Sequence, residues 1–200
     1  MNIGILGYQG GIDEHKYMVI ESCKELGIQC SVETVVKPQQ LNKLDGLIIP
    51  GGESTTIVKL AKRYNMIEEI KSKLIEGLPV LGTCAGAIFL AKKVTDLKTR
   101  KELQGTIGLL DVIVVRNFYG RQKESFEIDL EIPTLGEKPF RAIFIRAPAI
   151  IEISGKVKPL AIYGENYVFV QQDAILATVF HPELSGDTRI HRYFLEIVKK

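Results

Sequence analysis

The sequence predicts an α/β protein with a mostly parallel, doubly wound sheet and an antiparallel extension. The first hundred residues alternate short β-like runs with helical patterns, which is typical of βαβ units. The later residues contain further strand-like runs with almost no helices between them. A chain of 200 residues with 46% apolar residues is long enough for one sizeable core, so we expect a single domain over residues 1–200.

The first half is predicted to hold four strands and their connecting helices. Apolar positions repeat at helical spacing over residues 12–26, and Gly27 is suited to end that helix. A second helical stretch runs from Ser54 or Thr55 to about Glu76 with a break near Asn65, and a third follows Cys84 to Lys93. The four expected strands cover residues 2–7, 28–35, 45–50 and 78–83.

The second half is predicted to be mostly antiparallel. Residues 94–108 are polar and irregular, and an amphipathic helix ends the chain over about 188–198. Between them we expect strands at residues 109–116, 125–132, 140–147, 159–164, 167–172 and 174–180.

Composition excludes several classes of function. A formal charge of +2, from 26 basic and 24 acidic residues, gives no long-range field for nucleic acid, and no basic stretch alternates with stacking aromatics. No apolar run approaches the roughly 18 residues of a membrane span, and the N-terminal residues lack the basic segment of a signal peptide. We therefore expect a cytoplasmic protein that binds neither nucleic acid nor a membrane.

The cysteines are predicted to form neither a structural disulfide nor a zinc site. Cys23, Cys30 and Cys84 cannot all pair, occur in no CxxC spacing, and have no histidine nearby at metal-ligand spacing. The glycines at positions 4, 7, 10 and 11 do not fit G-x-G-x-x-G, so no dinucleotide site is expected either.

Cys84 stands between an apolar strand and an apolar helix, with Gly82 and Gly86 on either side. This is the pattern of a nucleophile elbow, in which the reactive side chain sits on a strained turn between strand and helix. A thiolate at a helix N-terminus is stabilised by the helix dipole and free amides. On this pattern alone, a small buried cysteine at a tight turn is an equally good interpretation.

His181 and Glu183 flank Pro182 at the end of a predicted central strand. Proline favours extended geometry in the residue before it, and residues two apart in an extended segment face the same side. The carboxylate of Glu183 could then fix one imidazole nitrogen and leave the other facing a thiol. Alone, such a segment is more often a turn with a surface charge pair.

Two other features suggest binding groups. The run PGGEST places Gly51 and Gly52 at a strand end before a helix, where their amides could stabilise an oxyanion. Arg116 and Arg146 follow strand-like runs, and a guanidinium is the usual partner of a substrate carboxylate, although most arginines are solvated. We expect His15 to be a solvated or capping residue and His191 to lie at the surface.

Six segments together resemble one family: GILGYQGGIDEH, LDGLIIPGGESTTI, PVLGTCAGAIFLAKK, VVRNFYGRQKESFE, FIRAP and ATVFHPELSGDTRIH. GTCAG with HPE is specific to the class I, triad-type glutamine amidotransferases. PGGESTT, RNxxGRQxxSFE and FIRAP narrow the resemblance to the glutaminase subunits of pyridoxal 5'-phosphate synthase. The resemblance covers nearly the whole chain and implies the flavodoxin-like sheet of the class I glutaminases.

The resemblance also implies a reaction and its residues. Cys84 would be the nucleophile, with His181 and Glu183 completing the triad, and L-glutamine would be hydrolysed to glutamate and ammonia through a thioester. Glutamine contacts are implied for Gly52, Glu53, Ser54, Arg116, Ile145 and Arg146. The ammonia would pass to a separate synthase subunit in a large hetero-oligomer, with the partner surface including Gln9, Gly10 and Gly11. No cofactor or metal is required in this chain.

Three alternatives stay open at this point. The chain could be a glutaminase serving another biosynthetic enzyme, which the RNFYGRQ and FIRAP segments disfavour. It could be an intracellular cysteine peptidase on the same scaffold, which would need a peptide cleft. It could also be a catalytically silent binding module of flavodoxin-like shape.

Overall fold

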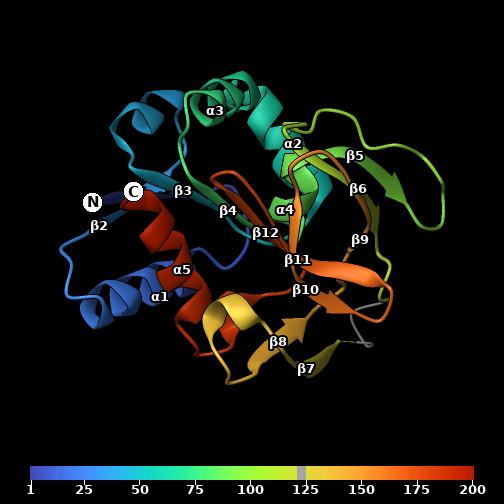
Figure 1. Cartoon of the computed structure of the whole chain (residues 1–200). Coiled ribbons are helices and arrows are strands. Elements are labelled where there is room, and N and C mark those ends of the chain that lie inside the picture. Colours follow the sequence, from blue (N-terminus) through green and yellow to red (C-terminus); the bar gives the residue numbers. More distant parts are fainter. Residues whose placement is uncertain (121–124) are drawn as a thin grey trace.

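A computed structural model describes residues 1–120 and 125–200, and its centre is a ten-stranded mixed sheet (Figure 1). The strands follow the order β2-β1-β3-β4-β12-β11-β9-β6-β5, with β10 paired to β11, while β7 and β8 form a separate hairpin sheet. The strands of the first half are β1 (Asn2–Leu6), β2 (Ser31–Val35), β3 (Gly46–Ile49), β4 (Val80–Thr83) and β5 (Ala91–Asp96). Those of the second half are β6 (Leu110–Arg116), β7 (Phe126–Leu130), β8 (Phe140–Phe144), β9 (Ala149–Ile153), β10 (Lys158–Tyr163), β11 (Asn166–Gln172) and β12 (Ile175–Thr178).

Helices cover both faces of the sheet. In Figure 1, α1 and α5 lie together on one face, whereas α2, α3 and α4 gather on the other. The α-helices are α1 (Ile12–Glu25), α2 (Ser54–Arg63), α3 (Met66–Ile75), α4 (Ala85–Leu90) and α5 (Arg189–Val198). Short 3-10 helices are η1 (Pro38–Lys43), η3 (Pro133–Leu135) and η4 (Pro182–Leu184). No helix in the described ranges is long and apolar enough to cross a membrane.

The predicted α/β fold is confirmed, and its parallel half positions the candidate site. β2, β1, β3, β4 and β12 are all parallel, and every residue of β3, β4 and β12 is buried, as expected for strands covered on both faces. The strand order reverses between β1 and β3, and ligands of such sheets bind beyond the carboxyl ends of the strands at that point. The segments 7–11 and 50–53 follow those two strands.

Two strands were not predicted. The helix expected to reach Lys93 ends at Leu90, and β5 follows at once with Ala91 and Val94 buried and Lys92 and Lys93 exposed between them. β9 lies between β11 and β6 in a run of apolar residues that carries no alternation to identify it as a strand. The break predicted near Asn65 is confirmed, because this residue adopts a left-handed conformation between α2 and α3.

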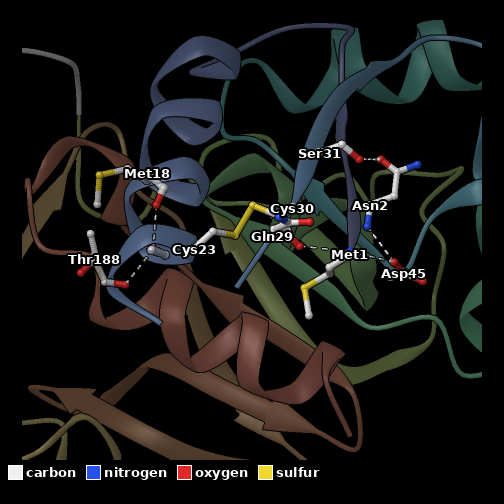
Figure 2. The surroundings of a disulfide bond; sticks show 10 residues. Met1, Asn2, Met18, Cys23, Gln29, Cys30, Ser31, Asp45 and Thr188 are labelled. Atoms are coloured by element: carbon white, nitrogen blue, oxygen red, sulfur yellow. Dashed lines mark hydrogen bonds and ion pairs between the residues drawn. A yellow bond between two sulfur atoms is a disulfide. The ribbon is translucent and has the colours of Figure 1, made fainter. Parts of the chain in front are cut away.

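The expectation that no disulfide forms was wrong. Cys23, in the last turn of α1, is bonded to Cys30, just before β2 (Figure 2). Gly27 has a φ of 63° and turns the chain back, which brings the two Cα atoms to 6.4 Å. That separation suits a disulfide, and a turn of this kind is not visible in cysteine spacing alone. Cys84 remains as the free cysteine.

Candidate active site

Cys84 occupies a strained turn between β4 and α4. Its φ of 48° lies in the left-handed region, which residues other than glycine rarely adopt. A β carbon at Gly82 would lie 2.8 Å from the carbonyl carbon of Gly86, and one at Gly86 would collide with the carbonyl of Ile49. The Cys84 amide donates to the carbonyl of Thr178 at 2.8 Å, which ties the turn to the end of β12. The predicted nucleophile elbow is therefore present in geometry.

His181 and Glu183 pair as the sequence predicts, although through a different local structure. The His181 Nδ1 atom lies 2.7 Å from the Glu183 Oε1 atom. Residues 182–184 form the 3-10 helix η4 rather than an extended segment, and this turn brings the carboxylate back under the ring. Only 1% of the Glu183 side chain and 12% of the His181 side chain are exposed, so the pair is shielded from water.

The imidazole of His181 favours its protonated form. Burial lowers the pKa of His181, but its hydrogen bonds to Cys84 and Glu183 outweigh burial and raise the pKa to about 10. Burial raises the pKa of the Glu183 carboxyl, yet the imidazoles of His15 and His181 reverse that effect and hold the pKa below its usual range. A buried carboxylate beside a protonated imidazole is the charge arrangement of a general acid and its orienting group.

The segment 50–53 lies directly beside the thiol. A β carbon at Gly51 would lie 3.0 Å from His181 Nδ1 and 3.3 Å from the β carbon of Cys84. Gly52 has a φ of 134°, which only glycine adopts freely. Outside regular helices and strands of the described residues, the amides of Gly51 and Gly52 donate to no backbone carbonyl. Amides without a backbone acceptor are what an oxyanion site requires.

The loop of residues 9–11 supports this segment. The Glu53 amide donates to Gln9 Oε1 at 3.2 Å, and a β carbon at Gly10 would collide with the carbonyl of Gly51. A β carbon at Gly11 would lie 3.2 Å from Glu183 Oε1. This loop therefore touches both the candidate oxyanion segment and the Glu183 carboxylate, while Gln9 and Gly10 are themselves exposed.

A pocket of about 260 Å³ opens above the thiol and gathers most of the predicted binding residues. Arg116, at the end of β6, reaches across it and its Nη2 atom lies 3.2 Å from Glu53 Oε1. The Ile145 carbonyl lies 4.0 Å from the Cys84 sulfur, and Arg146 follows with a left-handed φ of 48°. The lining residues are Gln9, Gly52, Glu53, Ser54, Cys84, Ile88, Arg116, Asn117, Ile145, Arg146, Pro148 and His181.

Four predicted site residues do not line the pocket. Gly51 and Glu183 adjoin His181, and Gly10 and Gly11 adjoin Gly51 and Glu183 respectively. Ile88, Asn117 and Pro148 also line the pocket and were not predicted from the sequence. Asn117 follows Arg116 in the sequence, and Pro148 ends the FIRAP segment. This proximity to predicted binding residues could have identified both. Residues 121–124 of the RNxxGRQxxSFE motif lie outside the described part of the chain.

The expectations for His15 and His191 were wrong. Both side chains are fully buried, and His15 Nδ1 lies 2.9 Å from His191 Nε2. The other nitrogen of His15 lies 3.4 Å from Glu183 Oε2 and 3.2 Å from Thr83 Oγ1. α1 and α5 pack together on the same face of the sheet, so two residues 176 positions apart meet under the triad.

Within residues 1–120 and 125–200, no group of three histidine, cysteine, aspartate or glutamate side chains is placed to hold a metal ion.

Comparison with known proteins identifies a family. Residues 5–200 match the SNO glutamine amidotransferase family. A protein of Staphylothermus marinus named pyridoxal 5'-phosphate synthase subunit PdxT is 54% identical over the full length of both chains. Proteins with the same name from Thermotoga neapolitana and Saccharolobus solfataricus are 50% and 48% identical, again over both full lengths.

Solved structures agree with this assignment. A crystal structure described as a glutamine amidotransferase is 45% identical, covers 99% of each chain and superposes with a TM-score of 0.84. A second glutamine amidotransferase, from Thermotoga maritima, covers 98% of this chain and 81% of its own with a TM-score of 0.59. Its identity of 15% supports the shared fold only.

Proposed function

Because this chain belongs to the SNO glutamine amidotransferase family, we propose that it hydrolyses L-glutamine to glutamate and ammonia with Cys84, His181 and Glu183 as its triad. The observation that carries the proposal is the strained Cys84 turn beside the His181–Glu183 pair, at the floor of one pocket. We further propose that residues 1–200 act as one glutaminase domain. Relatives that are 48% and 54% identical are named as subunits of pyridoxal 5'-phosphate synthase. These names support delivery of the ammonia to a synthase subunit that makes pyridoxal 5'-phosphate.

The proposed reaction proceeds through a thioester. His181 holds the proton that the Cys84 thiol gives up, and the sulfur then bonds to the side-chain amide carbon of glutamine. The amides of Gly51 and Gly52 stabilise the oxyanion, and the imidazolium then protonates the leaving nitrogen as the carbon–nitrogen bond breaks. Water, deprotonated by His181, attacks the thioester, which releases glutamate and restores the thiol. Glu183 holds the imidazole but transfers no proton.

The pocket supports a small amino acid as the substrate. Its volume of about 260 Å³ lies below the range of about 300–1,000 Å³ typical of larger ligands, which disfavours a peptide substrate. Arg116 has five N–H donors and spends one on Glu53, so it retains donors for a substrate carboxylate. We propose that Glu53, Ser54, Ile145 and Arg146 complete the contacts with glutamine, together with Gly52.

The partner and compartment belong to the same proposal. We expect a synthase subunit to dock against Gln9, Gly10 and Gly11, within a hetero-oligomer, and the chain to work in the cytoplasm. Cell fractionation and copurification with the synthase subunit would test both statements.

Cys84→Ala is expected to abolish ammonia release from glutamine by the assembled complex. Pyridoxal phosphate synthesis by the same complex should continue when ammonium salt replaces glutamine, because only the ammonia-producing step needs the thiol. Glutamate is measured in one assay and the product chromophore in the other. Glutaminase activity near the wild-type rate in Cys84→Ala would refute the assignment.

A further inference from the structure

Two histidines outside the proposed triad form a buried chain that ends on its carboxylate. His15 on α1 and His191 on α5 are both fully buried. The chain runs from His191 Nε2 to His15 Nδ1 at 2.9 Å, and from His15 Nε2 to Glu183 Oε2 at 3.4 Å. Burying two imidazoles without solvent is unfavourable unless their nitrogens are paired, so this arrangement needs an explanation.

Both imidazoles are neutral near pH 7. Burial lowers the pKa of His15, an effect that the carboxylates of Glu183 and Glu14 oppose and that the imidazolium of His181 reinforces. Burial likewise lowers the pKa of His191 to about 3, with His15 adding to the effect and Glu183 opposing it. Thr83, on β4, is a neutral neighbour of His15. Each ring therefore carries one proton, and only one of the two can donate in the contact between them.

The surroundings select one pair of tautomers. If His15 donated from Nδ1, its Nε2 lone pair would face the Glu183 carboxylate, and the proton on His191 Nδ1 would be buried without an acceptor among the described residues. If instead His191 donates from Nε2, then His15 accepts at Nδ1 and presents its Nε2 proton to Glu183 and Thr83. The unpartnered atom is then a lone pair on His191 Nδ1, which is the less costly group to bury unpaired.

This donor meets the free oxygen of the triad carboxylate. Glu183 Oε1 is used by His181 at 2.7 Å, whereas Oε2 is buried and makes no hydrogen bond of ordinary length within the described residues. His15 Nε2 lies 3.4 Å from that oxygen, a contact longer than an ordinary hydrogen bond, and an N–H group at this place stabilises a buried carboxylate without adding a charge. His15 also contacts Thr83, the residue before the nucleophile, so it spans the two halves of the site.

We propose that His15 is a positioning residue of the triad, which holds Glu183 through its Nε2 proton while His191 fixes the His15 tautomer. This inference rests on the proposed function, because it assigns Glu183 the orienting role. Without the His15 donor, the buried carboxylate has one uncompensated oxygen, which favours the protonated carboxyl and weakens its hold on His181. The activity should then require a higher pH.

The first test is an NMR measurement on the wild-type protein, with substitutions used only to assign the signals. The chain has three histidines, His15, His181 and His191, so ¹⁵N labelling of histidine gives a spectrum with few signals. Long-range ¹H–¹⁵N spectra of the wild-type protein should show His15 and His191 as neutral Nε2–H tautomers at pH 7. Single His→Gln variants assign the signals. An Nδ1–H tautomer or an imidazolium at His15 at pH 7 would overturn the proposal.

The second test compares His15→Leu with His15→Gln in the presence of saturating synthase subunit. For His15→Leu, kcat should fall about 10- to 100-fold with KM within about twofold, the scale seen when the support of a functional group is removed. The acid limb of its kcat/KM profile should move to higher pH by about one unit. His15→Gln, whose amide can donate at the same place, should restore most of the wild-type kcat and of the wild-type acid limb.

Ser22→Ala is the matched control. Ser22 lies on the same helix, is fully buried and hydrogen bonds the Met18 carbonyl, so this variant should keep the wild-type profile. Wild-type kcat and acid limb in a folded His15→Leu, or equal losses in Ser22→Ala, would contradict the positioning role. The His15 tests and the test of the proposed function can fail independently. Glutaminase activity in Cys84→Ala would refute the proposed function, but it would not change the tautomers of His15 and His191.

Discussion

At the scale of single residues, the candidate site depends on a Cys84 conformation that the surrounding backbone enforces. Cys84 is held at a φ of 48° by the hydrogen bond that its amide donates to the Thr178 carbonyl, and by two glycines that let the neighbouring backbone approach. A strained conformation persists only where its surroundings determine it, and such conformations concentrate at functional sites. The geometry therefore favours a reactive thiol over a merely buried one.

Glu183→Gln is expected to lower glutamine turnover by roughly two to four orders of magnitude, the scale for triad orienting groups and oxyanion donors. The amide can still contact His181 Nδ1, but it cannot stabilise the imidazolium, so glutamine affinity should change little. Steady-state kinetics of the assembled complex would measure both. If turnover held and only affinity fell, Glu183 would be a binding residue and the triad would be wrong.

At the scale of elements, the loop of residues 9–11 connects the proposed partner surface to the chemistry. The Gln9 side chain accepts a hydrogen bond from the Glu53 amide. Gly10 packs against Gly51, and Gly11 packs against Glu183. Two adjacent glycines leave the peptide between Gly51 and Gly52 free to turn, so a partner that fixes the loop can select the orientation that serves the oxyanion.

We therefore expect the isolated chain to be a poor glutaminase that the synthase subunit activates, and Gln9→Ala to reduce this activation. The substitution removes the acceptor of the Glu53 amide without touching the triad. Glutamine hydrolysis is titrated with the synthase subunit for both proteins, with Gln40→Ala as a control, since Gln40 caps η1 away from the pocket. Equal rates with and without the partner would rule out gating.

The elements differ in how far the sequence could predict them. Runs such as residues 46–49 and 80–83 are buried on both faces and flanked by turn residues, so their strands were predictable. β5 was missed because Lys92 and Lys93 extend a helical pattern that tertiary pairing with β6 overrides. η4 was missed because a single turn of 3-10 helix leaves no periodicity, yet it preserves the contact between His181 and Glu183.

At the scale of the whole molecule, contacts between distant segments were the ones that the sequence could not supply. His15 and His191 meet only because α1 and α5 pack side by side, and neither residue has a local pattern that indicates burial. The disulfide depends likewise on a turn at Gly27. The Cys84 turn and the contact between His181 and Glu183 were predictable because each of these residues stands in a local motif at a strand end.

The buried histidines should also shape stability as a function of pH. His191 has a folded-state pKa of about 3 against roughly 6.5 in the unfolded chain, so the unfolded state binds more protons between those values. The free energy of unfolding should then fall by about 3 kcal/mol from pH 7 to pH 4 because of His191. His181, with its pKa raised to about 10, contributes stability below about pH 6.5 that is lost as the pH rises toward 10.

Urea unfolding of the wild-type chain and of His191→Gln at pH 7 and pH 4 measures the first effect. The variant should lose less stability on acidification than the wild type, by an amount of that order. An identical acid loss in both proteins would show that His191 is not buried as a neutral imidazole.

The most direct test of the account is to capture the glutamyl thioester on Cys84. The complex with its synthase subunit is quenched in acid during glutamine turnover, digested and analysed by mass spectrometry. We predict a glutamyl group, removable by hydroxylamine, on the peptide that contains Cys84, and none in Cys84→Ala; with Cys23 and Cys30 in a disulfide, Cys84 is the free thiol. Continued ammonia release with no adduct on Cys84, or with the adduct on another residue, would contradict the account.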